Sequence, residues 1–342
     1  MIYDLSILDK LVAKDELIKF EKDNLVQYDY TDKTRYDGIW NRYTLFIRGN
    51  IYEKDSGELI GKSLPKFFNY DELPQNLQNN LTTQKFTCTE KYDGCLGIIY
   101  QYEDNIYCNT RNGFDNSITK VMYELISDTN IDLSCLSIMN LVVEVICPES
   151  HMQVDYKDKK ELRLITAYYK VTGTELSYEE LKDISSLIGI PVVEEFPMDW
   201  EDLFDYQNAE YNNTEGYVLR FAGNLRVKIK NKHYIELYKE HLDVTPAGIL
   251  TLLLNNSIQQ VENKIKSLPD ELYETAEHIL LDLLDQITKA KMEAKNLYNE
   301  IKDSPDMQTI LEQSKYKDMI EAYINDNTQL FHQLAIMRIL IK

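Results

Sequence analysis

The sequence lacks the features that mark secreted, membrane-spanning and fibrous proteins. Its 342 residues include only 5 cysteines, 12 glycines and 8 prolines. The cysteines are odd in number and form no CxxC pair, which predicts reduced thiols instead of a disulfide framework. The longest apolar runs, such as residues 247–254, are far shorter than the roughly 20 residues of a transmembrane helix. The N-terminus has mixed charge and no secretory pattern, so we expect a cytoplasmic protein without a membrane segment.

An excess of basic residues is also missing. The net charge is −20, and residues 241–342 carry 10 Lys and Arg against 16 Asp and Glu. Proteins that coat nucleic acid neutralise many phosphates, so this composition argues against that class. Any contact with nucleic acid requires a local basic groove on an acidic body, which suits an enzyme that grips strand ends. The hydrophobic content of 44% is typical of a globular protein.

The first two thirds of the chain predict an α+β fold. Residues 1–20 have apolar side chains near helical spacing and are expected to form an amphipathic helix. From about residue 25 to 240, short β-rich runs lie between Gly, Asn and Asp turns. The expected strands are residues 43–52, 96–102, 141–147, 162–169, 216–221 and 225–230, and the expected helices are residues 116–127 and 177–187. This mixture is typical of antiparallel sheets with helices.

The last hundred residues predict an all-helical region. Thr245 followed by Pro246 is a typical helix start, with the threonine as N-cap. Residues 267–270 open a second helix, residues 303–305 interrupt the helical period, and residues 320–341 resume it. We therefore expect two domains, an α+β domain of residues 1–242 and an all-helical domain of residues 243–342.

One lysine lies where a nucleophile would be useful. Residues 90–94 read Glu-Lys-Tyr-Asp-Gly and lead into an apolar strand. A free lysine, with a pKa near 10.4, is a poor nucleophile at neutral pH. Neighbouring cations lower the pKa of a lysine, so that it can lose its proton and attack phosphorus. The cations needed lie downstream at Lys228 and Lys230, which alternation along a strand places on one face, where both can reach a phosphate. The alternatives are a lysine before a β-turn and a solvated strand face.

Two acids lie on apolar strands, Glu144 among valines and Glu215 just before Gly216. A carboxylate in such a place needs a partner, because burying it alone is costly. A hydrated metal ion, a ribose hydroxyl or a structural arginine or lysine would each serve.

The order of these motifs resembles the covalent nucleotidyltransferase superfamily of DNA ligases, RNA ligases and mRNA capping enzymes. The order is KxDG, TRNG, a strand glutamate, EGYV and KxK. The flanking segments resemble the bacteriophage RNA ligase 1 family over about residues 28–240. These segments are residues 46–49, 65–69, 144–156 and 228–234.

The resemblance implies a role for each matching position. Lys91 would be the nucleophile that forms lysyl-AMP, with Lys228 and Lys230 on the α-phosphate. Glu215 would hold the catalytic metal, and Glu144 the ribose or the metal's water shell. The other positions implied at the ATP or AMP site are Tyr28, Arg48, Lys66, Phe68, Glu90, Asp93, Gly94, Arg111 and Gly216. Tyr30 is an alternative counterpart to Tyr28, and Cys95 stands where the family often has serine.

The function implied is that of an ATP-dependent RNA ligase that uses magnesium or manganese. Its partners would be ATP and RNA 5′-phosphate and 3′-hydroxyl ends, including those of broken tRNA. The resemblance further implies a monomer, located in the host-cell cytoplasm if a phage encodes it, with the helical domain selecting the RNA. DNA ligases and capping enzymes usually continue with a β-rich domain, whereas helices follow here.

Three other interpretations come from the residues themselves. Residues 57–63 approach a phosphate-binding P-loop but fit a hairpin better. Cys95 with one of five histidines would make a thiol enzyme, although a small buried residue fits better, and no histidine spacing indicates zinc. A catalytically inactive RNA-binding protein on the same fold remains the alternative from a different class.

Overall fold

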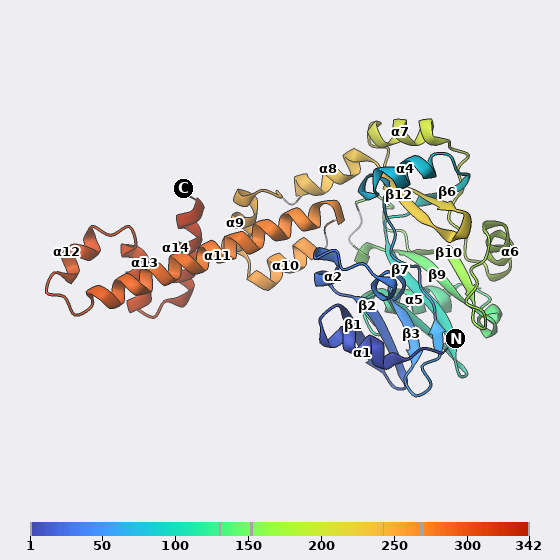
Figure 1. The fold of residues 1–342 in the computed structure, drawn as a ribbon, viewed down its shortest axis with the longest axis horizontal. Coiled ribbons are helices and arrows are strands. Elements are labelled where there is room, and N and C mark those ends of the chain that lie inside the picture. Colours follow the sequence, from blue (N-terminus) through green and yellow to red (C-terminus); the bar gives the residue numbers. More distant parts are fainter. Residues whose placement is uncertain are drawn as a thin grey trace. The chain divides into compact units, whose positions relative to one another are not determined.

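The computed structural model describes residues 2–129, 131–150, 153–241, 243–266, 268 and 270–340 (Figure 1). The chain divides into two units, Met1–Tyr234 and Ile235–Lys342. The expected domain boundary after residue 242 falls on a residue outside the described ones. The assignment of separate functions to residues 1–242 and 243–342 therefore stays a prediction.

Three four-stranded sheets build the first unit, in agreement with the predicted α+β class. The first sheet has the order β1 (Leu17–Lys22), β2 (Leu25–Tyr30), β3 (Asn50–Glu53), β4 (Leu59–Gly61). The second has the order β10 (Glu161–Tyr169), β9 (Met139–Ile146), β7 (Cys95–Tyr102), β8 (Asn105–Thr110). The third has the order β5 (Phe68–Asn69), β12 (Arg226–Lys230), β11 (Gly216–Phe221), β6 (Phe86–Lys91). Neighbouring strands are antiparallel except β5 and β12.

Helices bury one face of each sheet. The helices are α1 (Leu5–Ala13), α2 (Asp32–Tyr36), α3 (Arg42–Phe46), α4 (Gln75–Leu81), α5 (Ser117–Asp128), α6 (Tyr178–Ile188) and α7 (Trp200–Asn208). Leu8 of α1 packs on the first sheet. Met122 of α5 and Leu181 of α6 pack on the second, and Leu203 of α7 packs on the third. Burial of these apolar side chains fixes the sheets that carry the site.

The predicted helices at residues 116–127 and 177–187 are confirmed as α5 and α6. Asn116 and Ser177 cap them, each in a capping box with the residue three positions later. Gly189 ends α6 in the left-handed conformation, with φ of 79°. The five strands predicted between residues 96 and 230 correspond to β7, β9, β10, β11 and β12.

Two predicted elements are wrong. Residues 17–22 form β1 and do not continue the N-terminal helix, because Asp15 turns the chain with φ of 61°. Leu17 is then buried opposite Tyr30 in the first sheet. Residues 42–46 form α3 where a strand is predicted, because Asn41 and Thr44 make a capping box. The predicted strand at residues 43–52 is reduced to its end, in β3.

Residues 57–63 enter a β-hairpin, as the sequence predicts. They run from the turn after β3 into β4, and Tyr52 of β3 pairs with Leu59 of β4. A P-loop requires a helix directly after the glycine-rich loop. The next element here is a strand, so the P-loop interpretation is excluded.

The described part of the second unit is helical, as predicted. α8 (Lys232–His241) crosses the sequence boundary between the units. It is followed by α9 (Pro246–Asn255), α10 (Ile258–Lys266), α11 (Asp270–Ile301), α12 (Met307–Glu312), α13 (Lys317–Ile324) and α14 (Thr328–Leu340). Thr245 caps α9 by accepting a hydrogen bond from the Gly248 amide, and Pro246 stands in the first turn. Ser267 and Pro269, part of the predicted start of the second helix, lie outside the described residues.

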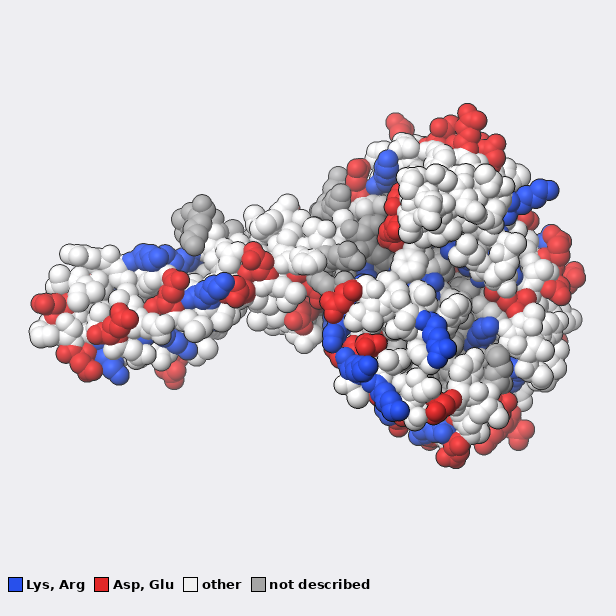
Figure 2. Space-filling view, in the orientation of Figure 1, with Lys and Arg blue, Asp and Glu red and all other residues white. Residues whose placement is uncertain are grey.

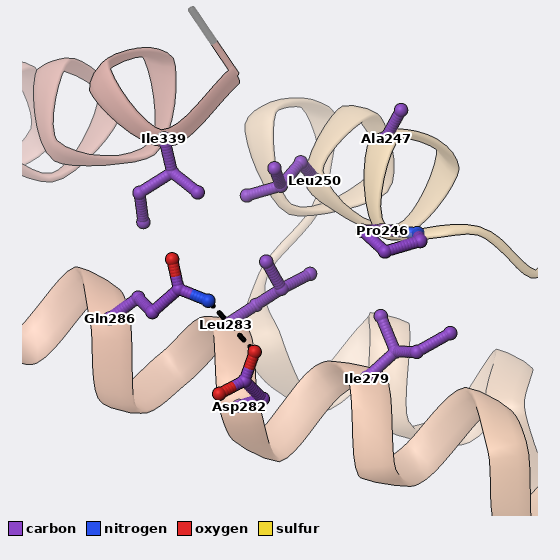
Figure 3. Close-up of a pocket in the computed structure, with 8 residues that line it drawn as sticks. All are labelled: Pro246, Ala247, Leu250, Ile279, Asp282, Leu283, Gln286 and Ile339. Atoms are coloured by element: carbon purple, nitrogen blue, oxygen red, sulfur yellow. Dashed lines mark hydrogen bonds between the residues drawn. The ribbon is translucent and has the colours of Figure 1, made fainter. Parts of the chain in front are cut away.

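An apolar pocket of about 350 Å³ lies between α9, α11 and α14 (Figure 3). Its lining residues are Pro246, Ala247, Leu250, Ile279, Asp282, Leu283, Gln286 and Ile339. Gln286 donates a hydrogen bond of 2.8 Å to Asp282 at its polar side. The pocket contains none of the predicted site residues. Within the described ranges, no helix is both long enough and apolar enough to cross a bilayer.

Candidate active site

The third sheet brings three distant segments to one edge. β11 lies between β6 and β12, with Gly216 opposite Lys91 on one side and Lys230 on the other. Both neighbours run antiparallel to β11, so their carboxyl ends meet its first residue. Lys91 is the last residue of β6 and Lys230 is the last of β12. The sheet therefore places the predicted nucleophile beside the predicted phosphate-binding lysine.

Glu215 connects these two lysines. Lys91 Nζ donates a hydrogen bond of 2.6 Å to Glu215 Oε2, and Lys230 Nζ lies 3.2 Å from Glu215 Oε1. The Glu215 side chain is 4% exposed and that of Lys91 is 23% exposed. A buried carboxylate needs compensating charge, and two ammonium groups supply it. Lys91 keeps the access to solvent that a substrate requires.

Lys228 lies on the same face of β12 as Lys230, as strand alternation predicts. Both side chains are buried. The short strand β5 runs parallel to β12, with Asn69 opposite Lys228 and Phe68 opposite Val227. This pairing brings Phe68, which is 160 positions earlier than Lys228 in the printed sequence, to the same edge of the sheet.

The KxDG motif folds into a loop that the backbone holds from two sides. Asp93 Oδ2 accepts hydrogen bonds from the amides of Gln153 (2.7 Å) and Val154 (3.0 Å). The Asp93 amide donates to the Tyr156 hydroxyl at 3.0 Å. Burial raises the pKa of Asp93, and the charge of Glu215 raises it further. Asp93 thus fixes the loop after Lys91. His151 and Met152, within the predicted motif of residues 144–156, lie outside the described residues.

Gly94 is required by space. A Cβ at this position would lie 2.6 Å from the carbonyl oxygen of Val145 and 3.1 Å from Cγ of Glu144. The loop carrying Lys91 therefore approaches β9 more closely than any side chain allows.

Glu144 is the one acid of β9 and lies among charges from three segments. Burial raises the pKa of Glu144 to about 7, and the nearby Lys91 opposes this increase. Glu215 and Asp93 also raise it, whereas Arg48 lowers it. The carboxylate therefore belongs to the same electrostatic site as Lys91 and Glu215.

A second group of cations surrounds Tyr30. Burial alone would raise the pKa of the Tyr30 hydroxyl, but three positive charges lower it. The three cations are Arg111, Arg48 and Lys66. The Arg111 guanidinium lies 4.4 Å from the centre of the Tyr30 ring and makes two hydrogen bonds to Asp29, of 2.7 and 3.1 Å. Within the part of the chain that the structure describes, the buried Nε of Arg48 has no hydrogen-bond partner.

Trp40 is a component of the site that the sequence analysis misses. The Lys66 ammonium lies between three rings, at 5.4 Å from Trp40, 5.3 Å from Phe68 and 6.0 Å from Tyr30. Trp40 makes edge contacts with the Tyr30 and Phe68 rings. The faces of aromatic rings attract cations. Trp40 belongs to no motif. The sequence offers only a weak signal for it, a rare tryptophan (one of two) eight residues before Arg48.

Two predicted ATP-site residues lie apart from these groups. Tyr28 is buried against α1 in the core of the first sheet, and its hydroxyl donates to Asp9 at 3.0 Å. Its assignment to ATP stays a prediction, and the geometry favours the alternative, Tyr30. Glu90 points to the opposite face of β6 from Lys91. Its pKa is raised by burial, and its carboxylate is hydrogen-bonded with Tyr92.

A divalent metal ion fits this site only with help from the substrate. Among the described residues, no group of three or more His, Cys, Asp or Glu side chains is arranged to hold a metal. Magnesium often binds through one or two carboxylates together with substrate phosphates. Glu144 and Glu215 meet that requirement. Burial raises the pKa of Glu144 and the charge of Glu215 adds to that increase, and a bound cation would relieve the repulsion between the two carboxylates.

The fold is that of the nucleotidyltransferase ligases. An archaeal ATP-dependent RNA ligase has 18% sequence identity and a TM-score of 0.52, over 83% of this chain and 79% of that chain. A protein from Aquifex aeolicus, provisionally described as an ATP-dependent DNA ligase, has 19% identity and a TM-score of 0.51, over 92% and 89%. A mutant Naegleria gruberi RNA ligase solved with ATP and manganese has 16% identity and a TM-score of 0.41, over 70% of this chain and 84% of that chain.

The sequence model of the RNA ligase family, a family of phage enzymes, matches residues 46–234. This is more than half of the chain, and it includes the candidate site residues from Arg48 to Lys230. The chain belongs to the RNA ligase family. A search of curated proteins finds no match.

Proposed function

We propose that this protein is an ATP-dependent RNA ligase that joins a 5′-phosphate to a 3′-hydroxyl through lysyl-AMP and RNA-adenylate. The observation that carries the proposal is the contact of Lys91 with one carboxylate oxygen of Glu215, while Lys230 contacts the other oxygen. A binding protein has no need of a partly exposed lysine between a buried carboxylate and further lysines. The family match supports the choice of RNA.

In the first step, Lys91 Nζ attacks the α-phosphorus of ATP. A phosphorus–nitrogen bond forms, the bond to the bridging oxygen of the β-phosphate breaks, and pyrophosphate leaves with the electron pair. Glu215, which accepts a hydrogen bond from Lys91, is positioned to receive the proton that the ammonium must lose. Lys228 and Lys230 neutralise charge that develops on the α-phosphate.

The cations around Tyr30 would hold the leaving pyrophosphate. Arg48, Lys66 and Arg111 come from three segments and lie close enough to one ring to alter its pKa together. A triphosphate brings several negative charges, and positioned cations stabilise them during transfer. When bound, magnesium or manganese supplies Lewis-acid stabilisation of the phosphates, with Glu215 and Glu144 as its protein ligands.

In the second step, an oxygen of the RNA 5′-phosphate attacks the lysyl-AMP phosphorus and the bond to Lys91 breaks. In the third, the 3′-hydroxyl attacks the activated 5′-phosphate and AMP leaves. We extend the proposal to the repair of broken RNA, with a cleaved tRNA as a substrate to be tested. We further propose that the protein acts as a monomer and that its helical domain selects the RNA.

The decisive experiment incubates the protein with magnesium and ATP labelled at the α-phosphate, beside Lys91→Ala. We expect label on the wild type and none on the variant. Strand-joining assays with matched RNA and DNA ends then separate an RNA ligase from a DNA ligase. Absence of label on the wild type, after removal of any bound AMP, would instead support the inactive RNA-binding protein.

A further inference from the structure

Lysines line one side of helix α11 near its C-terminal end. Lys291 and Lys295 lie in α11, and Lys302 is the residue directly after it, with its amide still bonded to the Tyr298 carbonyl oxygen. Their spacings of four and seven residues place the three lysines within about 40° of one another around the helix axis. Glu293 and Glu300 face the other side. Lys295 and Lys302 are exposed, and Lys291 is half-buried. The helix thus carries a row of lysines in a unit whose acids outnumber its bases.

These three lysines have no acidic partner. Within the described part of the chain, no ion pair joins Lys291, Lys295 or Lys302 to a carboxylate. Other lysines of the same unit do have such partners. Lys289, on the opposite side of α11, lies 2.6 Å from Asp285, and Lys317 lies 2.7 Å from Glu312.

Helix α14 and the end of α13 add a further base and two rings to this row. Lys291 Nζ lies 2.6 Å from His332 Nδ1. Burial lowers the pKa of Lys291 and the charge of Lys295 lowers it further, which is the effect of crowded positive charges. The Lys295 ammonium lies 5.1 Å from the centre of the Tyr323 ring and 5.8 Å from that of Phe331. The rings hold the ammonium in place and reduce the entropy lost when it binds an anion.

We propose that Lys291, Lys295, Lys302 and His332 form a surface, the α11 basic surface, that binds phosphate groups of the RNA whose ends the first unit joins. The identity of the polyanion rests on the proposed function. Successive lysines of the row stand about 6 Å and about 10 Å apart along the helix, so they face phosphates spread along a strand. Acidic side chains are spread over the surfaces of both units (Figure 2). These charges repel RNA, so RNA binding requires a local basic surface such as this one.

The test compares two double variants of the full chain that remove the same charge. Lys295→Gln with Lys302→Gln removes two exposed lysines of the α11 basic surface. Lys289→Gln with Lys317→Gln removes an exposed and a partly exposed lysine, each of which pairs with an acid in the same unit. The probe is a 5′-phosphorylated oligoribonucleotide with a 3′ fluorophore, and its affinity is measured by anisotropy over a series of salt concentrations. Lysyl-AMP formation from ATP alone is measured on the same samples.

We expect the surface variant to bind the probe about ten-fold more weakly at low salt, with a salt slope smaller by about 1.4. The control variant should change by less than about two-fold, and all proteins should form lysyl-AMP equally. Equal losses in both variants, or no loss in the surface variant, would overturn the proposal. Displacement of the probe by polyglutamate as effective as by unlabelled RNA would also overturn it, in favour of an acidic protein partner. If the wild type forms no lysyl-AMP, the proposed ligase activity is refuted, but the comparison of RNA affinities between the two variants still tests the α11 basic surface.

Discussion

The ammonium of Lys91 donates a 2.6 Å hydrogen bond to the carboxylate of Glu215, across 124 positions of sequence. The contact exists because β6 and β11 are neighbours and Lys91 stands opposite Gly216. Glu215 shares its other oxygen with Lys230. One buried carboxylate therefore organises both the predicted nucleophile and a predicted phosphate-binding lysine.

Glu215→Gln should reduce lysyl-AMP formation by about 100-fold or more. The substitution removes the negative charge that pairs with Lys91 and Lys230, and with it the carboxylate proposed to receive a proton or bind the metal. The measurement is the initial rate of label transfer from ATP labelled at the α-phosphate. Glu210→Gln, an exposed acid shortly before it, is the matched control and should retain the wild-type rate. Equal rates for the two variants would contradict the role of Glu215.

Gly216→Ala should lower the free energy of unfolding by about 1–3 kcal/mol through overpacking. A Cβ at this position would lie 2.1 Å from the Ile229 carbonyl oxygen, so the two strands would have to separate. Gly223→Ala is the comparison, because a Cβ there has open space and adds only backbone strain of about 1 kcal/mol. Urea titration of both variants measures the difference. An equal loss in both would show that crowding is not the cause.

Glu144→Gln should make the ligand-free protein more stable relative to wild type as pH rises. The pKa of Glu144 is raised to about 7 by burial, above the ordinary 4.5 of a glutamate. The folded wild type therefore holds a proton that the unfolded chain releases, and its stability from this group falls between about pH 4.5 and about pH 7. Melting temperatures of both proteins across this range test the prediction. Glu124→Gln, an exposed acid of α5, should show no such trend.

Trp40→Leu should raise the ATP concentration needed for half-maximal lysyl-AMP formation by about ten-fold, because Lys66 loses the ring 5.4 Å away that helps to hold it. Trp40 acts as a positioning residue, so the maximal rate should change less than the half-saturating concentration. Trp40→Phe keeps an aromatic face and should recover most of the affinity. A similar deficit in both variants would point to a general packing defect.

Cys95→Ser should retain lysyl-AMP formation within about two-fold, because the thiol is not positioned as a nucleophile. Burial raises the pKa of Cys95 to about 12, so almost no thiolate is present at neutral pH. Iodoacetamide should therefore label Cys95 in the native protein far more slowly than in the unfolded chain. Rapid modification with loss of activity would revive the thiol-enzyme interpretation.

Local patterns predicted the elements whose signals lie within a few residues. Asn116 and Ser177 start α5 and α6 through capping boxes, and Thr245 with Pro246 starts α9. The same reasoning failed at Leu17, where an apolar residue at helical spacing belongs to a strand. Spacing alone could not distinguish a helix from a strand at Leu17, because the strand is formed by pairing with Tyr30 in the neighbouring strand β2.

The order of motifs predicted the residues of the site better than their arrangement. Lys91, Glu215 and Lys230 do come together. Tyr28, chosen for its place in the sequence, is buried under α1, while Tyr30 lies among the cations. Trp40 carries no motif, and its position became evident only when Lys66 and Phe68 were placed beside it.

The sequence by itself determined the types of most elements, the helical nature of the C-terminal region and the choice of candidate site residues. These depend on periodicity, caps and short motifs, which act over a few positions of the chain. Only the tertiary structure decided that one carboxylate serves Lys91 and Lys230, and that three rings surround Lys66. Both arrangements depend on strand pairing and packing between segments far apart in sequence, where the free energy of burying the whole sheet selects the register.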